Sequence, residues 1–153
     1  KFHDSENLCD LINVNLVSQL NLYSELYSAN KILEGGKCVF IGSILGPSIG
    51  MVGGLAYAAA KAGIVGACKV LALESARRNI NVNVVSPGML ESPLTDNLSL
   101  SKTLLDIDRG RYPLGKTYIE LSEVSSVIDF LLSDKSKAIT GQNIFVERGF
   151  TLV

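Results

Sequence analysis

The sequence predicts an α/β fold in which a parallel β-sheet carries helices. Three short runs of strand-forming residues, at 38–41, 81–85 and 144–146, alternate with longer segments of helical periodicity. The first run is continuously apolar and is flanked by glycine, which is typical of a strand buried on both faces of a parallel sheet. Alternation of strand and helix is the pattern of α/β domains.

The first expected element is a helix that begins at Asp4 or Ser5, either of which can act as its N-cap. Its apolar residues recur at helical spacing: Leu8, Leu11, Ile12, Leu16, Leu20 and Leu26. Gly35-Gly36 should stop this helix, because glycine favours the left-handed conformation found just beyond helix C-termini. The strand at 38–41 follows and ends at Gly42-Ser43.

A Gly-rich loop leads from this strand to an Ala-rich helix at 55–78 and then to the strand at 81–85, which Pro87-Gly88 closes. The next connection has about 30 residues, a length at which loops are usually functional, and we expect it to form a lid with some helix near 99–106. A helix at 120–132 and the strand at 144–146 complete the pattern. No internal repeat is present, so we expect residues 1–153 to belong to one domain.

Composition favours a globular protein that acts on small molecules. Hydrophobic residues make up 47% and charged residues 19% of the 153 residues, and the formal net charge is -1. The 14 basic and 15 acidic side chains form no long run of one sign, so no nucleic-acid partner is expected. Lys61 and Lys69 interrupt the apolar stretch at 50–73, which argues against a membrane span.

The three cysteines, Cys9, Cys38 and Cys68, are odd in number, widely spaced and outside any Cys-x-x-Cys pair. This pattern argues against a disulfide framework and against a zinc site, so no metal is expected. A reducing, cytoplasmic location fits best, and the polar residues 1–10 do not resemble a signal peptide.

Residues with acid/base chemistry lie where two of these elements meet. Tyr57 and Lys61 are four residues apart, so they project from the same face of the helix at 55–78. Free tyrosine has a pKa of about 10, and a lysine ammonium beside it favours the phenolate. Ser43 follows a strand, at the carboxyl edge where open α/β sheets bind ligands, and its hydroxyl can hydrogen-bond a carbonyl oxygen. The three side chains together suit proton transfer to a carbonyl compound.

The spacing Tyr-x-x-x-Lys is weak evidence by itself, because it occurs three times in the chain. Tyr27 lies late in the first helix without a strand-end serine before it, and Tyr112 is followed by Pro113, which disfavours helix. Only Tyr57 lies in a predicted helix that follows a strand-end serine. From periodicity alone, a packed tyrosine with a solvated lysine is as acceptable as a catalytic pair.

Six landmarks, taken in order and spacing, resemble those of the short-chain dehydrogenase/reductase family in its short single-domain branch. They are Asn13-Val14-Asn15-Leu16, Phe40-Ile41-Gly42-Ser43, Tyr57-Ala58-Ala59-Ala60-Lys61-Ala62-Gly63, Asn81-Val82-Asn83-Val84-Val85-Ser86-Pro87-Gly88, Tyr112-Pro113-Leu114-Gly115-Lys116 with Glu123-Val124, and Ile139-Thr140-Gly141-Gln142. The resemblance covers residues 5–150. It implies a Rossmann-like, doubly wound parallel sheet with helices on both faces.

The resemblance implies an oxidoreductase that interconverts a carbonyl and an alcohol with NADP or NAD. Tyr57 would be the general acid/base, and Ser43 would orient the carbonyl. Lys61 would hold the nicotinamide ribose and lower the pKa of Tyr57, while Asn15 would support a water that leads to Lys61.

The resemblance also implies further cofactor contacts. Pro87 and Gly88 would pass under the nicotinamide, and Leu90 would offer backbone contacts to its carboxamide. Ser92 stands where threonine is more usual and would donate its hydroxyl to the cofactor. The substrate would be a small carbonyl or alcohol, and the family implies a homodimer or homotetramer.

The chain departs from the family at both ends. Glu147-Arg148 replaces the Asp-Gly of a common ending, which leaves the form of the terminal turn open. The Thr-Gly-x-x-x-Gly-x-Gly turn, the residue that selects NAD or NADP, and Asn-Asn-Ala-Gly are missing upstream. We therefore expect residues 1–153 to be the C-terminal catalytic part of a longer domain, which lacks on the order of 90 residues at about 30 per βαβ unit. Alone, this part should be inactive and should bind the cofactor feebly, and an upstream segment, a partner chain or a second copy should cover its open sheet edge.

Several functions stay open. Reductases of 3-oxoacyl groups on acyl-carrier protein resemble the sequence closely, and Arg77-Arg78 at a helix end suits an anionic carrier, but Glu34 stands where many of them are basic. Reduction of a sugar, a sterol-like compound or another small ketone ranks only slightly lower. A non-catalytic dinucleotide-binding or assembly subunit is disfavoured because the four catalytic landmark residues are all present. An epimerase or dehydratase of the extended branch would carry a larger C-terminal substrate region.

Overall fold

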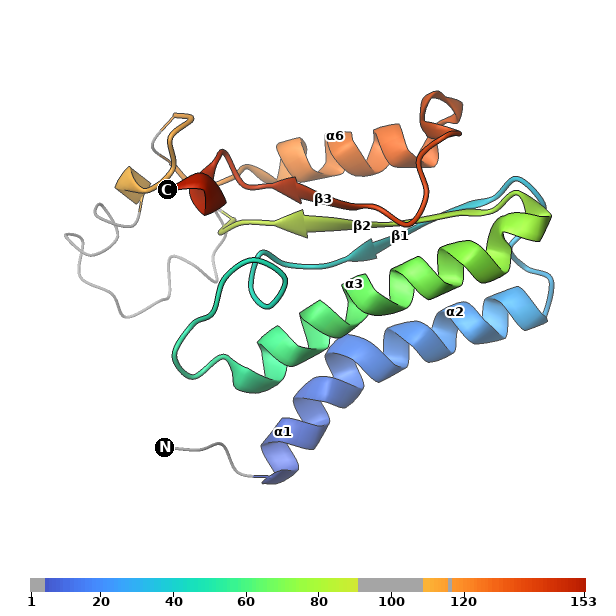
Figure 1. Ribbon diagram of the computed structural model, residues 1–153, viewed down its shortest axis with the longest axis horizontal. Coiled ribbons are helices and arrows are strands. Elements are labelled where there is room, and N and C mark those ends of the chain that lie inside the picture. The colour runs from blue at the N-terminus through green and yellow to red at the C-terminus, as the bar shows by residue number, and fades with distance from the viewer. Residues whose placement is uncertain (1–4, 91–108, 116) are drawn as a thin grey trace.

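The computed structural model describes residues 5–90, 109–115 and 117–153, and in these ranges three parallel strands form one sheet (Figure 1). The strands are β1 (Lys37–Ile41), β2 (Asn81–Pro87) and β3 (Asn143–Val146), in the order β1-β2-β3. Phe40 lies opposite Val84 in the first pair, and Val85 lies opposite Ile144 in the second. The predicted parallel sheet is confirmed, and each strand extends slightly beyond the predicted run.

The first layer of helices covers one face of the sheet. It contains α1 (Ser5–Ile12), α2 (Ser18–Ser28) and α3 (Leu55–Ser75), which a 3-10 turn (Ala76–Arg78) extends. Figure 1 shows α2 and α3 running side by side below the strands. The helices pack closely where Gly63 faces Leu16, because a Cβ on Gly63 would lie 2.9 Å from a methyl carbon of Leu16.

The predicted first helix is interrupted and ends early. A π-helical turn (Asn13–Val17) separates α1 from α2. Asn15 donates its side-chain amide to the carbonyl of Leu11 at 3.0 Å, and Gln19 donates to the carbonyl of Asn15 at 2.8 Å. Side chains that bind helix carbonyls in this way disturb the regular backbone ladder. Gly35-Gly36 does not stop the helix, because Asn30 already adopts the left-handed conformation with φ 53° just beyond α2.

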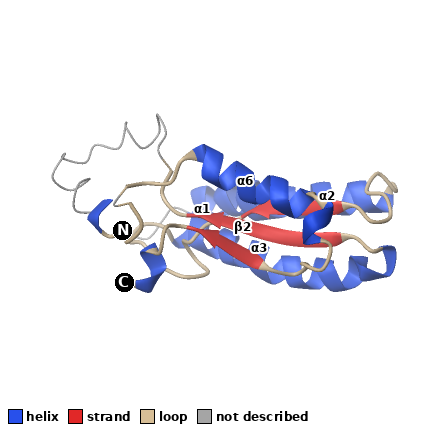
Figure 2. Cartoon of the chain, turned by 90° about the horizontal axis from the view of Figure 1, so that it is seen from above, coloured by secondary structure: helices blue, strands red, loops and turns tan. Residues whose placement is uncertain are grey.

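The second face of the sheet is covered by α6 (Leu121–Leu132), which lies over the strands in the view from above (Figure 2). Glu120 and Glu123 close its first turn as a reciprocal capping box. Side chains alternate along β2: Val82 and Val84 pack toward α3, whereas Val85 packs on the α6 side. Helices therefore cover both faces, as the resemblance implied, and all three valines are fully buried.

Asn83 fixes the connection between α6 and β3. Its side chain is buried, donates to the carbonyl of Ile139 at 2.8 Å and accepts from the backbone of Gln142 at 3.0 Å. The neighbouring residue on the same face, Asn81, donates to the carbonyls of Lys137 and Ile139. These bonds hold the loop before β3 in one position, which sets the register of that strand against β2.

The combined segment Leu55–Arg78 is long and apolar enough to cross a membrane by length and composition alone. In the structure it lies against β2 and α1, and its buried face includes Ala60, Ile64 and Cys68. Packing against the sheet thus accounts for the apolar composition of this helix.

Glu147 and Arg148 build the turn that follows β3. The Glu147 carboxylate accepts from the backbone of Gly149 at 3.2 Å and of Thr151 at 2.8 Å. Arg148 has a φ of 50°, and its guanidinium donates twice to the Glu123 carboxylate, at 3.2 and 2.6 Å. This ion pair ties the end of β3 to the start of α6, so the unusual residues of the C-terminal end have a structural role.

Candidate functional site

Ser43 lies at the carboxyl edge of the sheet, next to the end of β2. The backbone of Gly42 donates to Val85 at 2.7 Å, and that of Ile44 donates to Pro87 at 3.1 Å, so Ser43 is held between two cross-strand hydrogen bonds. Its side chain is buried, and its Oγ accepts from the backbone of Leu45 at 3.1 Å. The Ser43 hydroxyl hydrogen therefore does not take part in this bond and can be donated to a ligand.

The loop after Ser43 folds back on itself and contacts the first turns of α3. Gly46 has a φ of 97°, and its backbone donates to the carbonyl of Ile49 at 2.8 Å. A Cβ at Gly46 would overlap the carbonyl oxygen of Ala58 and lie 2.9 Å from the carbonyl carbon. Because this contact is between two backbones, only glycine fits, and the loop is fixed close to the helix turn that carries Tyr57.

Tyr57 and Lys61 lie one turn apart on α3. The Nζ atom of Lys61 is 5.5 Å from the centre of the Tyr57 ring and donates to the carbonyl of Ile41 at 3.0 Å. Lys61 is only 6% exposed, and burial lowers the pKa of its ammonium. The bond to Ile41 joins α3 to the end of β1, two residues before Ser43, so the helix and the strand end are fixed relative to each other.

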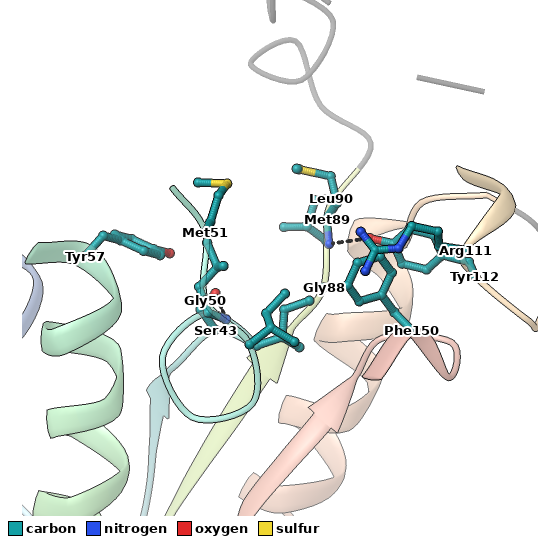
Figure 3. Close-up of a pocket in the computed structure, with 13 residues that line it drawn as sticks. Ser43, Gly50, Met51, Tyr57, Gly88, Met89, Leu90, Arg111, Tyr112 and Phe150 are labelled. Atoms are coloured by element: carbon teal, nitrogen blue, oxygen red, sulfur yellow. Dashed lines mark hydrogen bonds between the residues drawn. The ribbon is translucent and has the colours of Figure 1, made fainter. Parts of the chain in front are cut away.

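A pocket of about 420 Å³ opens at this edge of the sheet (Figure 3). Its lining residues are Ser43, Ile44, Leu45, Ile49, Gly50, Met51, Tyr57, Gly88, Met89, Leu90, Arg111, Tyr112 and Phe150. Figure 3 shows the Tyr57 hydroxyl directed toward the side of the pocket where Ser43 and Met51 lie. Four of the residues selected from the sequence thus line the same cavity: Ser43, Tyr57, Gly88 and Leu90.

The remaining selected residues lie outside the pocket lining or outside the described ranges. Lys61 adjoins the site through its contact with Tyr57, and the Pro87 carbonyl accepts from Ile44 at the base of the site. Asn15 lies in the π-helical turn, which packs against α3, and its side-chain amide binds within its own helix. Ser92 lies outside the described residues.

The wall opposite Tyr57 contains residues that were not selected as site residues. Tyr112 is buried, and its hydroxyl accepts from the backbone of Met89 at 3.2 Å. Phe150, from the C-terminal 3-10 turn (Phe150–Leu152), packs on Tyr112 with ring centres 4.8 Å apart. Arg111 completes this wall. In the sequence, the aromatic residue Phe150 directly after Gly149 could have been selected as a candidate for this wall. Only the folded chain, however, brings Phe150 beside the loop that contains Arg111 and Tyr112.

Comparison with known proteins identifies the family. A family profile described as enoyl-(acyl carrier protein) reductase matches residues 3–151. The chain belongs to the short-chain dehydrogenase/reductase family. It is 38% identical over 147 residues to the 3-oxoacyl-[acyl-carrier-protein] reductase FabG of Salmonella typhimurium, covering 94% of this chain and 57% of the relative. It thus spans little more than half the length of that relative.

Solved structures of the family have the same fold. A short chain dehydrogenase family protein from Francisella tularensis matches with a TM-score of 0.88 and 28% identity, over 99% of this chain and 65% of that one. A 4-hydroxyisoleucine dehydrogenase mutant, complexed with NADH and succinate, matches with a TM-score of 0.87 and 30% identity, over 98% of this chain and 61% of that one. The Rossmann-like architecture implied by the six landmarks is therefore confirmed.

Proposed function

We propose that this chain carries the catalytic residues of an NAD(P)-dependent oxidoreductase that interconverts a ketone and a secondary alcohol. The observation that supports this most directly is that Ser43 and Tyr57 line one pocket, while the buried ammonium of Lys61 lies beside the Tyr57 ring. A strand end and a helix turn thus place two hydroxyl groups and one cation around the same cavity. This set suits proton transfer to a carbonyl oxygen.

In the proposed reduction, the hydroxyl groups of Ser43 and Tyr57 both donate to the carbonyl oxygen of the substrate. Tyr57 then transfers its proton to that oxygen as the alcohol forms. The Lys61 ammonium favours the phenolate that is left on Tyr57, because opposite charges stabilise each other strongly where water is excluded. Ile44, Leu45 and other apolar residues line the pocket beside these groups.

The residues present suit the nicotinamide end of the cofactor, which supplies the hydride when bound. Lys61 has three N–H donors, and among the described residues Ile41 is its one hydrogen-bond acceptor. The remaining N–H groups of this buried ammonium can donate hydrogen bonds to the hydroxyl groups of a ribose. Gly88 and Leu90 line the pocket next to Ser43, which supports their proposed contacts with the nicotinamide. We propose NADP or NAD as the cofactor.

The name of the Salmonella relative supports a narrower proposal, reduction of 3-oxoacyl groups carried by acyl-carrier protein. Arg77 is exposed at the end of α3 and suits an acidic carrier, whereas Glu34 is exposed and hydrogen-bonded to Asn79 and would repel it. Reduction of a free small ketone is therefore the second candidate. The cytoplasm stays the proposed location, in keeping with the three free cysteines.

We also propose a homodimer or homotetramer. Three large apolar side chains on α3 are exposed, Leu55, Val70 and Leu73, with exposed fractions of 58%, 53% and 79%. Burial of such side chains against another chain would be favourable. We further propose that the 153-residue polypeptide alone has no dehydrogenase activity, because it contains no Gly-rich turn that could bind the cofactor phosphates.

The proposal is tested by incubating the full-length protein with NADH or NADPH and a panel of ketones, including 3-oxoacyl thioesters, and by following loss of the reduced-nicotinamide absorbance. We expect one oxidised cofactor for each secondary alcohol formed. Cofactor binding without turnover of any carbonyl compound would instead support a non-catalytic dinucleotide-binding subunit.

A further inference from the structure

The segment 88–90 follows β2 directly and lines the pocket at the point where the sheet ends. The backbone of Gly88 still donates to a carbonyl of β3 at 2.9 Å. At Met89 the partners change, because its carbonyl accepts from the backbone of Ile119 at 2.9 Å and its amide donates to the hydroxyl of Tyr112 at 3.2 Å (Figure 3). The segment that is proposed to contact the nicotinamide is therefore held in part by a side chain.

Tyr112 is itself held in place on several sides. It is 1% exposed and lies in an aromatic cluster, with ring centres 4.8 Å from Phe150 and 5.7 Å from Tyr118. The backbone of Leu114 donates to the carbonyl of Arg148 at 3.1 Å, which ties the chain after Tyr112 to the turn beyond β3. Because the ring is already fixed in the folded protein, its hydroxyl group holds a hydrogen-bond partner at little further cost in conformational freedom.

Packing alone does not explain the hydroxyl group of Tyr112. Phenylalanine would fill the same space in the aromatic cluster, and a hydroxyl group costs free energy in a buried place unless it is hydrogen-bonded. The bond to the Met89 amide satisfies it on the wall of the pocket, between Gly88 and Leu90. The landmark at 112–116 has no part in the chemistry proposed above, and this bond links it to the site.

We propose that Tyr112 is a positioning residue: its hydroxyl group holds the Met89 amide and thereby keeps the segment 88–90 in the conformation that receives the nicotinamide. This inference rests on the proposed NAD(P)-dependent activity. Without the hydroxyl group, the Met89 amide loses this acceptor, and the segment samples other conformations in the free protein. The nicotinamide must then order the segment when it binds, which lowers the affinity for the cofactor.

The test separates the nicotinamide from the rest of the cofactor in the full-length protein. Titration calorimetry gives the dissociation constants of the reduced cofactor that the protein uses, NADH or NADPH, and of the matching fragment without nicotinamide, ADP-ribose or its 2′-phosphate. Tyr112→Phe removes the hydroxyl group and keeps the ring. Tyr23→Phe is the matched control, because Tyr23 is also buried and its hydroxyl is bonded to the Ser75 hydroxyl at 2.6 Å, but it belongs to the core on the opposite face of the sheet.

For Tyr112→Phe we expect the affinity for the reduced cofactor to fall about five- to tenfold, whereas the affinity for the ADP-ribose fragment should change by less than about twofold. Tyr23→Phe should bind both ligands as wild type does, although it also loses a buried hydrogen bond. Equal losses of both ligands in Tyr112→Phe, no loss of either, or the same selective loss in Tyr23→Phe would overturn the inference while leaving dinucleotide binding in place. If wild type binds neither NADH nor NADPH, the proposed function itself is contradicted and the inference falls with it.

Discussion

Replacing Gly46 by alanine tests how the loop that lines the pocket is held against α3. The substitution carries two costs. A φ of 97° is unfavourable for any residue with a Cβ, by about 1–2 kcal/mol. The new Cβ would also overlap the backbone carbonyl of Ala58, and such overpacking typically costs about 1–3 kcal/mol. We therefore expect the free energy of unfolding of Gly46→Ala to fall by roughly 2–5 kcal/mol.

Two other glycines of the same loop separate these costs. Gly53 has a φ of 84°, but no atom of the described residues lies within 4 Å of an added Cβ, so Gly53→Ala should cost only the conformational part, about 1–2 kcal/mol. Gly50 has no positive φ, and within the described part of the chain nothing lies within 4 Å of an added Cβ, so Gly50→Ala should be neutral or slightly stabilising. Urea unfolding of the three full-length variants, at one protein concentration, gives the comparison. The reasoning is wrong if Gly46→Ala costs no more than Gly53→Ala.

Three further outcomes are expected. Lys61→Met should weaken cofactor binding about tenfold, because the buried ammonium proposed to bind the ribose hydroxyl groups is lost; if titration calorimetry gives the wild-type affinity, Lys61 has no role in holding the cofactor. Burial raises the pKa of the Cys68 thiol to about 11, so mass spectrometry after iodoacetamide treatment at mildly alkaline pH should find Cys9 modified first, and equal labelling would show that Cys68 is not buried. Arg148 lowers the pKa of Glu123 below 4.5, so their ion pair stabilises the fold above that pH and is lost as the pH falls through the lowered value. Arg148→Gln should therefore lower the free energy of unfolding by up to about 1 kcal/mol near neutral pH and by less in acid, and an equal loss in acid would contradict the ion-pair account.

The strands and the cores between the layers could be predicted because they depend on local pattern. A continuous apolar run at 38–41 and alternating valines in β2 are readable without a structure. The catalytic set was selected mainly through the resemblance to a family, since Tyr-x-x-x-Lys occurs three times and spacing alone does not separate the copies. The structure places Ser43 and Tyr57 at one pocket, as their positions after a strand and on the next helix suggested.

The unpredicted features depend on individual hydrogen bonds and on contacts between distant segments. The side chains of Asn15 and Gln19 bind helix carbonyls at the π-helical turn, and hydrophobic periodicity does not report such bonds. The early end of α2 uses the left-handed conformation of Asn30, a role more often given to glycine. The stacking of Arg111 on Phe150 joins the stretch before α6 to the residues after β3 and is visible only in the folded chain.

The most direct test of the proposed chemistry is Tyr57→Phe in the full-length protein, which removes one hydroxyl group and keeps the ring. The turnover number with a ketone that wild type reduces, and the cofactor dissociation constant, are measured for both proteins. Because Tyr57 is proposed to donate the proton, turnover should fall by at least about 100-fold, while cofactor affinity should hardly change. Near-normal turnover by Tyr57→Phe would contradict the assignment of this pocket as the active site.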